Sequence, residues 1–495
     1  MAGLSRPKTA SVSHRASTMK DMVRPMMVAL FFLSSALAQN LLSLAPQGAV
    51  AGFYMNDLRG SRYLGGLAAD WKQSGMEAFL GRELRKQAGN GADLLGFAAG
   101  GVAVALYNDG FFVMTRPSAA AMRALRRDAK GLRPQGGWLV ASDEETMTGF
   151  SRELVFIASS KYARLFLQNR RGLQAPVRGD IVLWGTPPHE LLQSLNLPPR
   201  ASGAARTIRR FSYAIQLTAG GYTEETRLEV NPAADPALAS LLLPKERPYD
   251  AAELPQGYSV STGVLDLSRV GAYLTGLLRE FDVRLNLDLR AFGARFATVT
   301  VKGPPPAPDG RSEAILGHSL IYWEIRDPAT AEANLLALLQ SLAAFSTPDG
   351  QGGFRVLGNE GEFKAVEVGL GGTLYYKLEP SRLVIATSKS ALQAVNNPPW
   401  GQDPNFRRFR ARIPANAIGY TFGNQGAALE EQLGQIGNAL PQTIGSELDQ
   451  QASRELNLAL TNFFGRLSKR FGSGLSYAVV EGNSLVSRGF YEVRW

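Results

Sequence analysis

The side chains that most often perform catalysis or bind metals are scarce in this sequence. It has no cysteine and three histidines, His14, His189 and His318. Disulfides, zinc–thiolate sites, iron–sulfur clusters and cysteine nucleophiles are therefore excluded, and a metal site built from several histidines is nearly excluded. The sequence has no phosphate-binding loop, nucleophile elbow, metalloprotease motif or calcium loop. We therefore expect no cofactor and no enzymatic activity, and we interpret His189 and His318 as hydrogen-bonded structural residues.

Two aspartates stand at matching places in two similar stretches. Asp57 follows an apolar run led by Pro46, and Asp266 follows a similar run led by Pro255. One interpretation is a pair of catalytic carboxylates. The other is a helix N-cap in each stretch, because an aspartate before a helix commonly accepts hydrogen bonds from the first helical N–H groups. We favour the caps, since repeated sequence predicts repeated structure.

Serine and lysine are adjacent twice at expected helix starts, as Ser160-Lys161 and Ser388-Lys389. A Ser–Lys hydrolase usually places its lysine one helical turn beyond the serine, as in S-x-x-K. Adjacent residues on a helix point in different directions, so these pairs fit a dyad poorly. We interpret them as helix starts capped by Ser159 and Thr387, each with a solvated lysine.

Positive charge is concentrated in one part of the chain. Residues 39–245 carry 24 Lys and Arg against 17 Asp and Glu, whereas residues 246–495 carry 24 against 25. Some of these basic residues are spaced so that they lie on one face of the helix expected at 118–130. The residues of this stripe are Arg123, Arg126, Arg127 and Lys130. A solvated helix face is one interpretation; contact with an anionic envelope polymer or lipid headgroup is the functional one.

Strand and turn signals predict an α+β fold. Asn108-Asp109-Gly110 between two apolar runs is a strong hairpin signal, and such hairpins alternate with helices along the chain. This alternation favours mostly antiparallel sheets covered by helices over a Rossmann fold or a barrel. The expected strands include 49–55, 102–107, 111–115, 154–158 and 180–185, then 258–265, 363–368, 373–378, 383–386 and 417–422, and the expected helices include 118–130 and 328–342.

Three matches in the same order indicate a tandem duplication. The first relates residues 44–67 to 254–277, which share Pro-Gln-Gly, Asp-Leu and Tyr-Leu-x-Gly-Leu. The second relates Ile157–Ala163 to Ile385–Ala391, and the third relates Ser212–Ile215 to Ser476–Val479. A repeat of this length predicts two domain-sized halves rather than a solenoid. We place them at 39–230 and 254–495, joined by a linker at 231–253.

The N-terminus has the three parts of a secretion signal. Five Lys and Arg residues precede the apolar run at 26–38, and Ala36-Leu37-Ala38 is a typical cleavage site. We expect residues 1–38 to be removed, so that the mature chain begins at Gln39, lacks a transmembrane segment and is periplasmic or extracellular. The start codon could be Met1, Met19 or Met22.

The repeated scheme resembles the exported bacterial proteins of domain of unknown function 3352. The resemblance rests on the Pro-led strand that ends in Asp-Leu, on Arg326-Asp327-Pro328 before a helix, and on the strand-to-helix run 383–392. It extends over most of the mature chain. This family brings no assigned activity, cofactor or catalytic residue, so the resemblance implies only the architecture and the export.

Together these features predict an exported, non-catalytic protein of the cell envelope. It would bind another protein or an anionic envelope surface, with the basic stripe as its contact. Nucleic acid is not expected as a partner outside the cell. The alternatives are a carrier of an apolar ligand held between sheet and helices, and a hydrolase that uses a carboxylate or Ser–Lys site.

Overall fold

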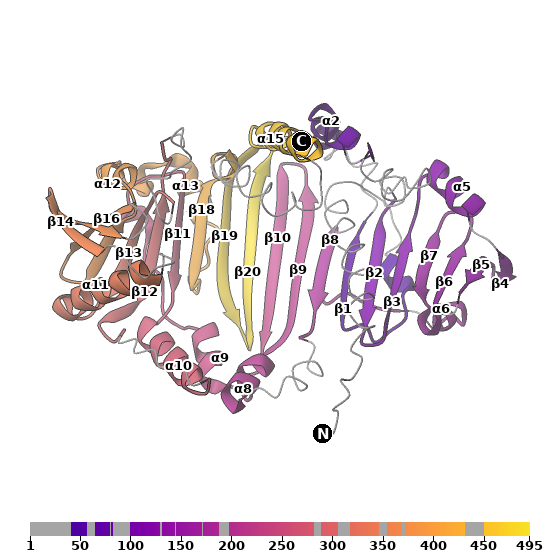
Figure 1. Ribbon diagram of the computed structural model, residues 1–495, viewed down its shortest axis with the longest axis horizontal. Helices are drawn as coiled ribbons and strands as arrows, with labels where there is room; N and C mark the ends of the chain where they lie inside the picture. Colours follow the sequence, from indigo (N-terminus) through magenta and orange to yellow (C-terminus); the bar gives the residue numbers. More distant parts are fainter. Residues whose placement is uncertain are drawn as a thin grey trace, which may run out of the picture. The chain divides into compact units, whose positions relative to one another are not determined.

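A computed structural model gives an α+β protein whose paired strands are all antiparallel (Figure 1). It describes residues 41–56, 65–79, 81–82, 100–128, 131–143, 145–170, 172–187, 198–281, 289–304, 317–345, 354–368, 372–430 and 450–495. The predicted signal peptide, Asp57, Lys130 and His189 lie outside these residues. The chain forms two compact units: unit 1 holds residues 1–72 and 77–175, and unit 2 holds residues 73–76 and 176–495.

Unit 1 contains a seven-stranded sheet among its described residues. Its strands run in the order β4-β5-β6-β7-β3-β2-β1. Its elements are η1 (Leu41–Leu44), β1 (Ala51–Met55), α2 (Gly65–Gln73), β2 (Val102–Tyr107), β3 (Gly110–Thr115), α5 (Ala119–Asp128), β4 (Arg133–Gln135), β5 (Trp138–Ser142), β6 (Thr146–Phe150), β7 (Val155–Ser159) and α6 (Ser160–Leu167).

Aromatic residues form the core under helix α6. Phe112, Phe156 and Phe166 are fully buried, and Trp138 meets the last two edge-on at 5.2 Å between ring centroids. The strand alternation places Phe112 and Phe156 on one sheet face, where α6 delivers Phe166. The apolar side chains that recur every second residue in the strands therefore pack against those that recur every 3.6 residues in the helix.

Unit 2 contains the longer sheet, with its strands in the order β14-β15-β16-β17-β13-β12-β11-β18-β19-β20-β10-β9-β8. Its elements are β8 (Ile181–Gly185), α8 (Pro199–Thr207), β9 (Ile208–Thr218), β10 (Gly221–Val230), α9 (Pro236–Leu242), η3 (Ala251–Glu253), β11 (Ser259–Val264), α10 (Leu267–Arg279), β12 (Phe292–Thr300), β13 (Ser319–Ile325), α11 (Pro328–Phe345), β14 (Phe354–Glu360), β15 (Phe363–Val368), β16 (Gly372–Leu378), β17 (Arg382–Ala386), α12 (Lys389–Ala394), η4 (Trp400–Gln402), α13 (Pro404–Arg410), β18 (Gly419–Asn424), α15 (Gln450–Leu467), β19 (Phe471–Glu481) and β20 (Ser484–Val493).

Two apolar cores hold the helices of unit 2 against the sheet. In one, Trp400, Phe406 and Phe409 from η4 and α13 meet Phe422 of β18 at 5.4 to 5.6 Å between ring centroids. In the other, Leu335 of α11 packs with residues of β15, β16 and β17. The predicted layer of helices over antiparallel strands is confirmed here.

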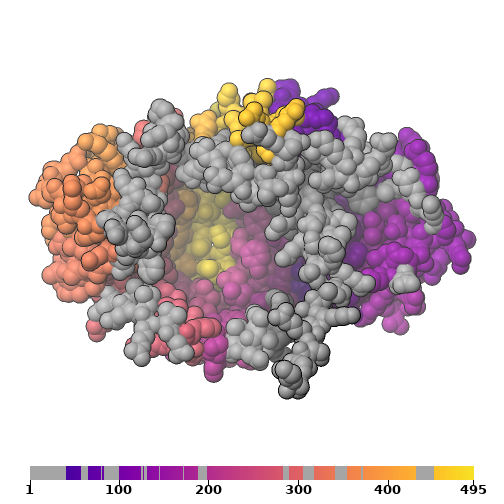
Figure 2. Space-filling view, in the orientation of Figure 1, coloured from indigo at the N-terminus to yellow at the C-terminus, as the bar shows by residue number. Residues whose placement is uncertain are grey.

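Strands β19, β20, β10 and β9 lie toward the β8 end of this sheet and differ from the rest, because most of their residues are half-exposed on both faces. Figure 2 looks onto one face, where yellow atoms of β19 and β20 and magenta atoms of β9 and β10 are visible. This part of the sheet therefore combines a few buried apolar residues, such as Val479 and Val486, with many half-exposed ones, and its cross-strand pairs also contribute to its stability.

The third of the sequence matches is shifted by one residue. The two hairpins end in equivalent pairs, Thr218 with Gly221 and Glu481 with Ser484. Counting back from these turns, Tyr477 corresponds to Ala214 and not to Tyr213. Because side chains alternate across a strand, aligning Tyr477 with Tyr213, as the sequence match does, would align residues that lie on opposite faces of the sheet.

The compact units do not coincide with the halves expected from sequence. Strands β8 to β10 lie in unit 2, although residues 181–230 belong to the predicted first half. The predicted linker contains α9 and η3 and is tied to the fold, since the Asp235 carboxylate accepts hydrogen bonds from Leu238 N and Tyr273 Oη. The repeat boundaries stay a prediction, because a sequence copy and a packing unit can end at different places.

Candidate functional site

Helix α5 carries the basic stripe and is held by its apolar side. Ser118 Oγ accepts a hydrogen bond from Ala121 N at 3.1 Å, which satisfies one free N–H group at the start of the helix. Met122 is buried in a cluster with Phe150 and Val155. The opposite side of α5 therefore faces outward, as the helical period predicts.

The arginines of α5 divide into two kinds. Arg123 and Arg127 are exposed, and no described carboxylate lies within 4.0 Å of either guanidinium. Arg126 is half-buried and donates a hydrogen bond to the carbonyl of Ser151. Arg126 thus ties α5 to the β6–β7 turn, and the free charge of the predicted stripe lies at Arg123 and Arg127 among the residues that the structure describes.

The same tie brings a further arginine to α5. Arg152 follows Ser151 in the β6–β7 turn and is exposed, and Arg116 Nε lies 3.9 Å from Glu153 in that turn. We call Arg123, Arg127 and Arg152 the basic patch. Arg152 stands 25 residues from Arg127 and carries no periodic signal in the sequence, so only the pairing of its turn with α5 relates it to the stripe.

Helix α11 is the expected counterpart of α5 and has no such patch. Its Glu332 accepts hydrogen bonds from Lys364 Nζ at 2.6 Å and from Tyr376 Oη at 2.7 Å. The bond from Lys364, helped by that from Tyr376, lowers the pKa of Glu332 below its ordinary range. Among the described residues, α5 thus presents two arginines with no carboxylate within 4.0 Å, while α11 carries a carboxylate bound to its own sheet.

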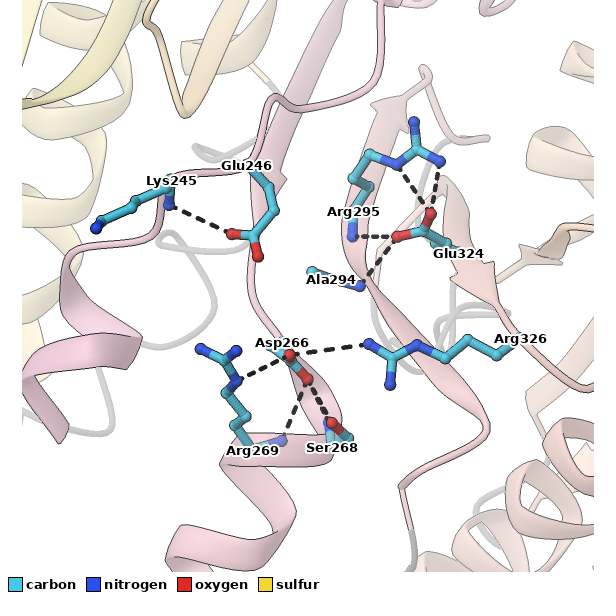
Figure 3. A network of polar contacts seen from close by, with 9 residues as sticks. All are labelled: Lys245, Glu246, Asp266, Ser268, Arg269, Ala294, Arg295, Glu324 and Arg326. Atoms are coloured by element: carbon cyan, nitrogen blue, oxygen red, sulfur yellow. Dashed lines mark hydrogen bonds and ion pairs between the residues drawn. The ribbon is translucent and has the colours of Figure 1, made fainter. Parts of the chain in front are cut away.

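Asp266 caps α10, which confirms the predicted role of this residue (Figure 3). Its carboxylate accepts hydrogen bonds from Ser268 N at 3.1 Å and Arg269 N at 3.2 Å, and the guanidiniums of Arg269 and Arg326 lie 3.3 and 3.9 Å away. Burial alone would raise the pKa of Asp266, but these partners outweigh it and lower the pKa. An anion so stabilised is a poor general acid.

Glu324 lies in the same region with an arginine partner of its own (Figure 3). It accepts hydrogen bonds from Ala294 N at 3.0 Å and Arg295 N at 3.1 Å, and Arg295 Nε donates to it at 3.0 Å. Burial opposes ionisation here too, yet the bonds from Arg295 lower the pKa of Glu324. Both carboxylates are therefore positioned as structural anions, and neither has the raised pKa of a catalytic acid.

The two Ser–Lys pairs direct their lysines to carboxylates. Lys161 Nζ donates to Asp109 Oδ2 at 2.7 Å, and Lys389 Nζ lies 3.2 Å from Glu360. Ser388 is the N-cap of α12, accepting a hydrogen bond from Ala391 N at 3.2 Å. The prediction that Thr387 caps this helix is wrong by one residue.

Thr387 and Ser159 use their hydroxyls to join strands instead. Thr387 Oγ1 accepts a hydrogen bond from Ser319 N at 2.8 Å, and Ser159 Oγ accepts one from Phe111 N at 3.1 Å. Ser159 stands at the N-cap of α6 but its side chain makes no cap bond. A hydroxyl can bind only the backbone groups within its reach. Here it reaches an N–H group of the neighbouring strand and makes no bond to the N–H groups at the start of the helix.

A buried histidine–serine pair lies beside these ties. His318 Nδ1 and Ser388 Oγ are 2.9 Å apart, and 8% of His318 and 2% of Ser388 are exposed. The prediction of a hydrogen-bonded structural histidine is confirmed for His318. A serine this deeply buried and already used as a cap is not open to a substrate, so the pair fits a structural role.

Two clefts in unit 2 have linings that mix polar and apolar residues. The larger, of about 750 Å³, is bordered by several amide side chains, among them Gln256, Gln393 and Asn397. The second, of about 510 Å³, is bordered by four glutamates together with Lys377 and Arg382. Neither is the apolar cavity that a carrier of an apolar ligand would require. The described residues form no cluster of His, Asp and Glu that could hold a metal ion.

No family model and no curated protein matches the chain. Among solved structures, crystal form III of TP0453 is 12% identical, with 43% of this chain and 90% of that chain covered and a TM-score of 0.24. Crystal form IV of TP0453 is 14% identical, with 42% and 86% covered and a TM-score of 0.25. Similarities this weak carry no argument about function. None of the described helices combines the length and apolar character needed to span a bilayer.

Proposed function

We propose that the protein is an exported, non-catalytic binding protein that contacts an anionic surface of the cell envelope through the basic patch of unit 1. One observation carries this proposal: Arg123 and Arg127 are exposed on α5 without a described carboxylate within 4.0 Å. Unpaired arginines on a helix face attract phosphate and carboxylate groups and present donors in a geometry that fits both.

The proposal includes the tandem duplication, which makes α11 an internal control. The strand order β4-β5-β6-β7-β3-β2-β1 in unit 1 parallels β14-β15-β16-β17-β13-β12-β11 in unit 2. The hydroxyl ties from Ser159 to Phe111 and from Thr387 to Ser319 are equivalent in both. One copy carries the patch and the other folds without it, so the fold of the copies does not depend on the patch.

The test is binding to vesicles of phosphatidylcholine with and without phosphatidylglycerol, followed by sedimentation of mature protein. We expect binding only to the anionic vesicles and its loss at about 1 M salt, where screening limits charge attraction to about 3 Å. The variant Arg123→Glu/Arg127→Glu/Arg152→Glu should lose this binding and keep its unfolding midpoint, because exposed charges contribute little to stability.

Two matched variants separate the patch from net charge. Arg164→Glu/Arg170→Glu reverses two exposed charges elsewhere in unit 1 and is matched in charge to Arg123→Glu/Arg127→Glu. The control should bind almost as well as the native chain, and the matched patch variant should not. Ala333→Arg/Ala337→Arg places two arginines on exposed positions of α11 and should not restore binding to the patch variant. Equal binding by the patch variant and the native chain would mean that α5 is only a solvated face. Binding to isolated anionic wall polymer, but not to vesicles, would identify the polymer as the source of the anions.

A further inference from the structure

Strands β10 and β20 pair along nine residues each toward the β8 end of the sheet of unit 2. The register runs from Gly221 opposite Glu492 to Glu229 opposite Ser484. Its central pair is Glu225 with Arg488. Figure 1 shows this seam between the β9–β10 and β19–β20 hairpins. In the proposed duplication, each hairpin closes one half of the chain.

The seam has local two-fold symmetry. Counted from the equivalent turns, Gly221 corresponds to Ser484, so Glu225 corresponds to Arg488. Two equivalent strands that pair antiparallel are related by a two-fold axis, which is the geometry of a symmetric dimer interface. The axis passes through the pair Glu225–Arg488, where a true dimer would place two identical residues opposite each other.

Four alternating charges form a ring on one face of the sheet, and this ring includes the pair on the axis. Arg488 Nε lies 3.0 Å from Glu225 and its Nη1 lies 2.8 Å from Glu481. Arg227 Nη2 lies 2.9 Å from Glu481 and 3.7 Å from Glu225. Each half contributes two members: β10 supplies Glu225 and Arg227, and the β19–β20 hairpin supplies Glu481 and Arg488. We call these four residues the charge ring.

The ring members are only half-exposed, with 28% to 37% of each side chain accessible. Hydrogen bonds from Arg488, assisted by Arg227, lower the pKa of Glu481. The ring is not alone at the seam, since Tyr222 of β10 stacks on Tyr491 of β20 at 4.7 Å between ring centroids, but the ring sets unlike charges opposite each other on the axis. A network of four charges in this setting is also less screened than an isolated surface pair.

We propose that the seam is the recognition interface between the two halves, and that the charge ring selects the pairing of unlike halves. The proposal rests on the duplication included in the proposed function. Pairing of two second halves would set Arg488 against Arg488, and pairing of two first halves would set Glu225 against Glu225. Like charges directly opposite each other in a sheet are destabilising, so the ring favours assembly within one chain and disfavours the same contact with a second copy.

The test is a charge-reversal cycle in the mature full chain, measured by thermal unfolding. Glu225→Arg and Arg488→Glu each place like charges on the axis, and we expect each to lower the midpoint by about 2–4 °C or more. The exchanged axis variant reverses the whole ring, Glu225→Arg/Arg227→Glu/Glu481→Arg/Arg488→Glu, because exchanging the central pair alone would leave like charges beside Arg227 and Glu481. It should recover most of the loss, which shows that the four charges act together.

The pair Arg210–Glu229 provides a control on the same face, since it lies at 3.6 Å between β9 and β10 of one half. Its exchange, Arg210→Glu/Glu229→Arg, should show a smaller coupling than the axis pair. No recovery in the exchanged axis variant, or equal coupling in the control, would overturn the proposed selection. Vesicle binding by the axis variants checks the proposed function separately, because the seam and the basic patch share no residue.

Discussion

Ser159 and Thr387 stand at equivalent strand ends, yet the residue type alone does not reveal what their hydroxyls bind. Each accepts a hydrogen bond from the backbone of the adjacent strand, and Thr387 Oγ1 also lies 2.6 Å from the carbonyl of Gly317. Thr387 is 1% exposed, so its partners have no access to water. Losing this hydroxyl would leave a buried N–H group unsatisfied, which costs more than the bond itself contributes.

We therefore expect Thr387→Val to reduce the free energy of unfolding by about 1–3 kcal/mol, because valine keeps the shape but not the acceptor. Thr387→Ser should recover part of this loss, and Ser159→Ala should cost less since Ser159 is only half-buried. Chemical denaturation at equilibrium measures all three. If valine were tolerated without loss, the hydroxyl would not be the group that fixes this strand end.

At the scale of elements, tertiary contacts decide which charged side chains are paired. This holds for helix α5 and for the β9–β10 and β19–β20 hairpins. Arg126 looks like part of a surface stripe in sequence but binds the carbonyl of Ser151, in the turn that also contains Arg152. Glu225 and Glu481 are distant in sequence and meet in one ring only because β10 pairs with β20. In both cases the pairing of elements decides which charges remain free for a partner.

The charge ring should make the seam sensitive to acid. The pKa of Glu481 is lowered in the folded protein from its ordinary value of 4.5. A lowered pKa contributes stability that is present above pH 4.5 and is lost as the pH falls through the folded-state pKa. We expect the native chain to have a higher unfolding midpoint than the variant Glu481→Gln at neutral pH. This difference in midpoint should shrink as the pH falls below 4.5. A difference that does not change in acid would contradict an ionised Glu481 in the ring.

At the scale of the whole molecule, the packing units and the predicted repeats divide the chain differently. The boundary between compact units falls at residues 175 and 176, whereas the sequence repeats are expected to meet at 231–253. Strands β8 to β10 therefore share a sheet with β18 to β20. A continuous sheet of this kind leaves fewer strand edges exposed than two separate sheets would.

Export itself is a prediction about the whole chain. We expect protein recovered from outside the cytoplasm to begin at Gln39, because the apolar run at 26–38 ends in Ala-Leu-Ala. N-terminal sequencing of the exported protein measures this directly, and Ala38→Arg should block the cleavage by placing a bulky charge where a small residue is required. An exported chain that retained residues 26–38 would contradict the cleavage site.

The sequence by itself determined the element types, the antiparallel α+β class, the cap at Asp266 and the apolar and basic faces of α5. These features depend on local periodicity and on hydrogen bonds between near neighbours, which a sequence records directly. Only the tertiary structure decided that Arg126 is a tie, that Arg152 joins the patch, that Ser388 and not Thr387 caps α12, and that Glu225 meets Arg488. Each depends on strand register or on contacts between distant segments, and a slip of one residue reverses which face a side chain occupies.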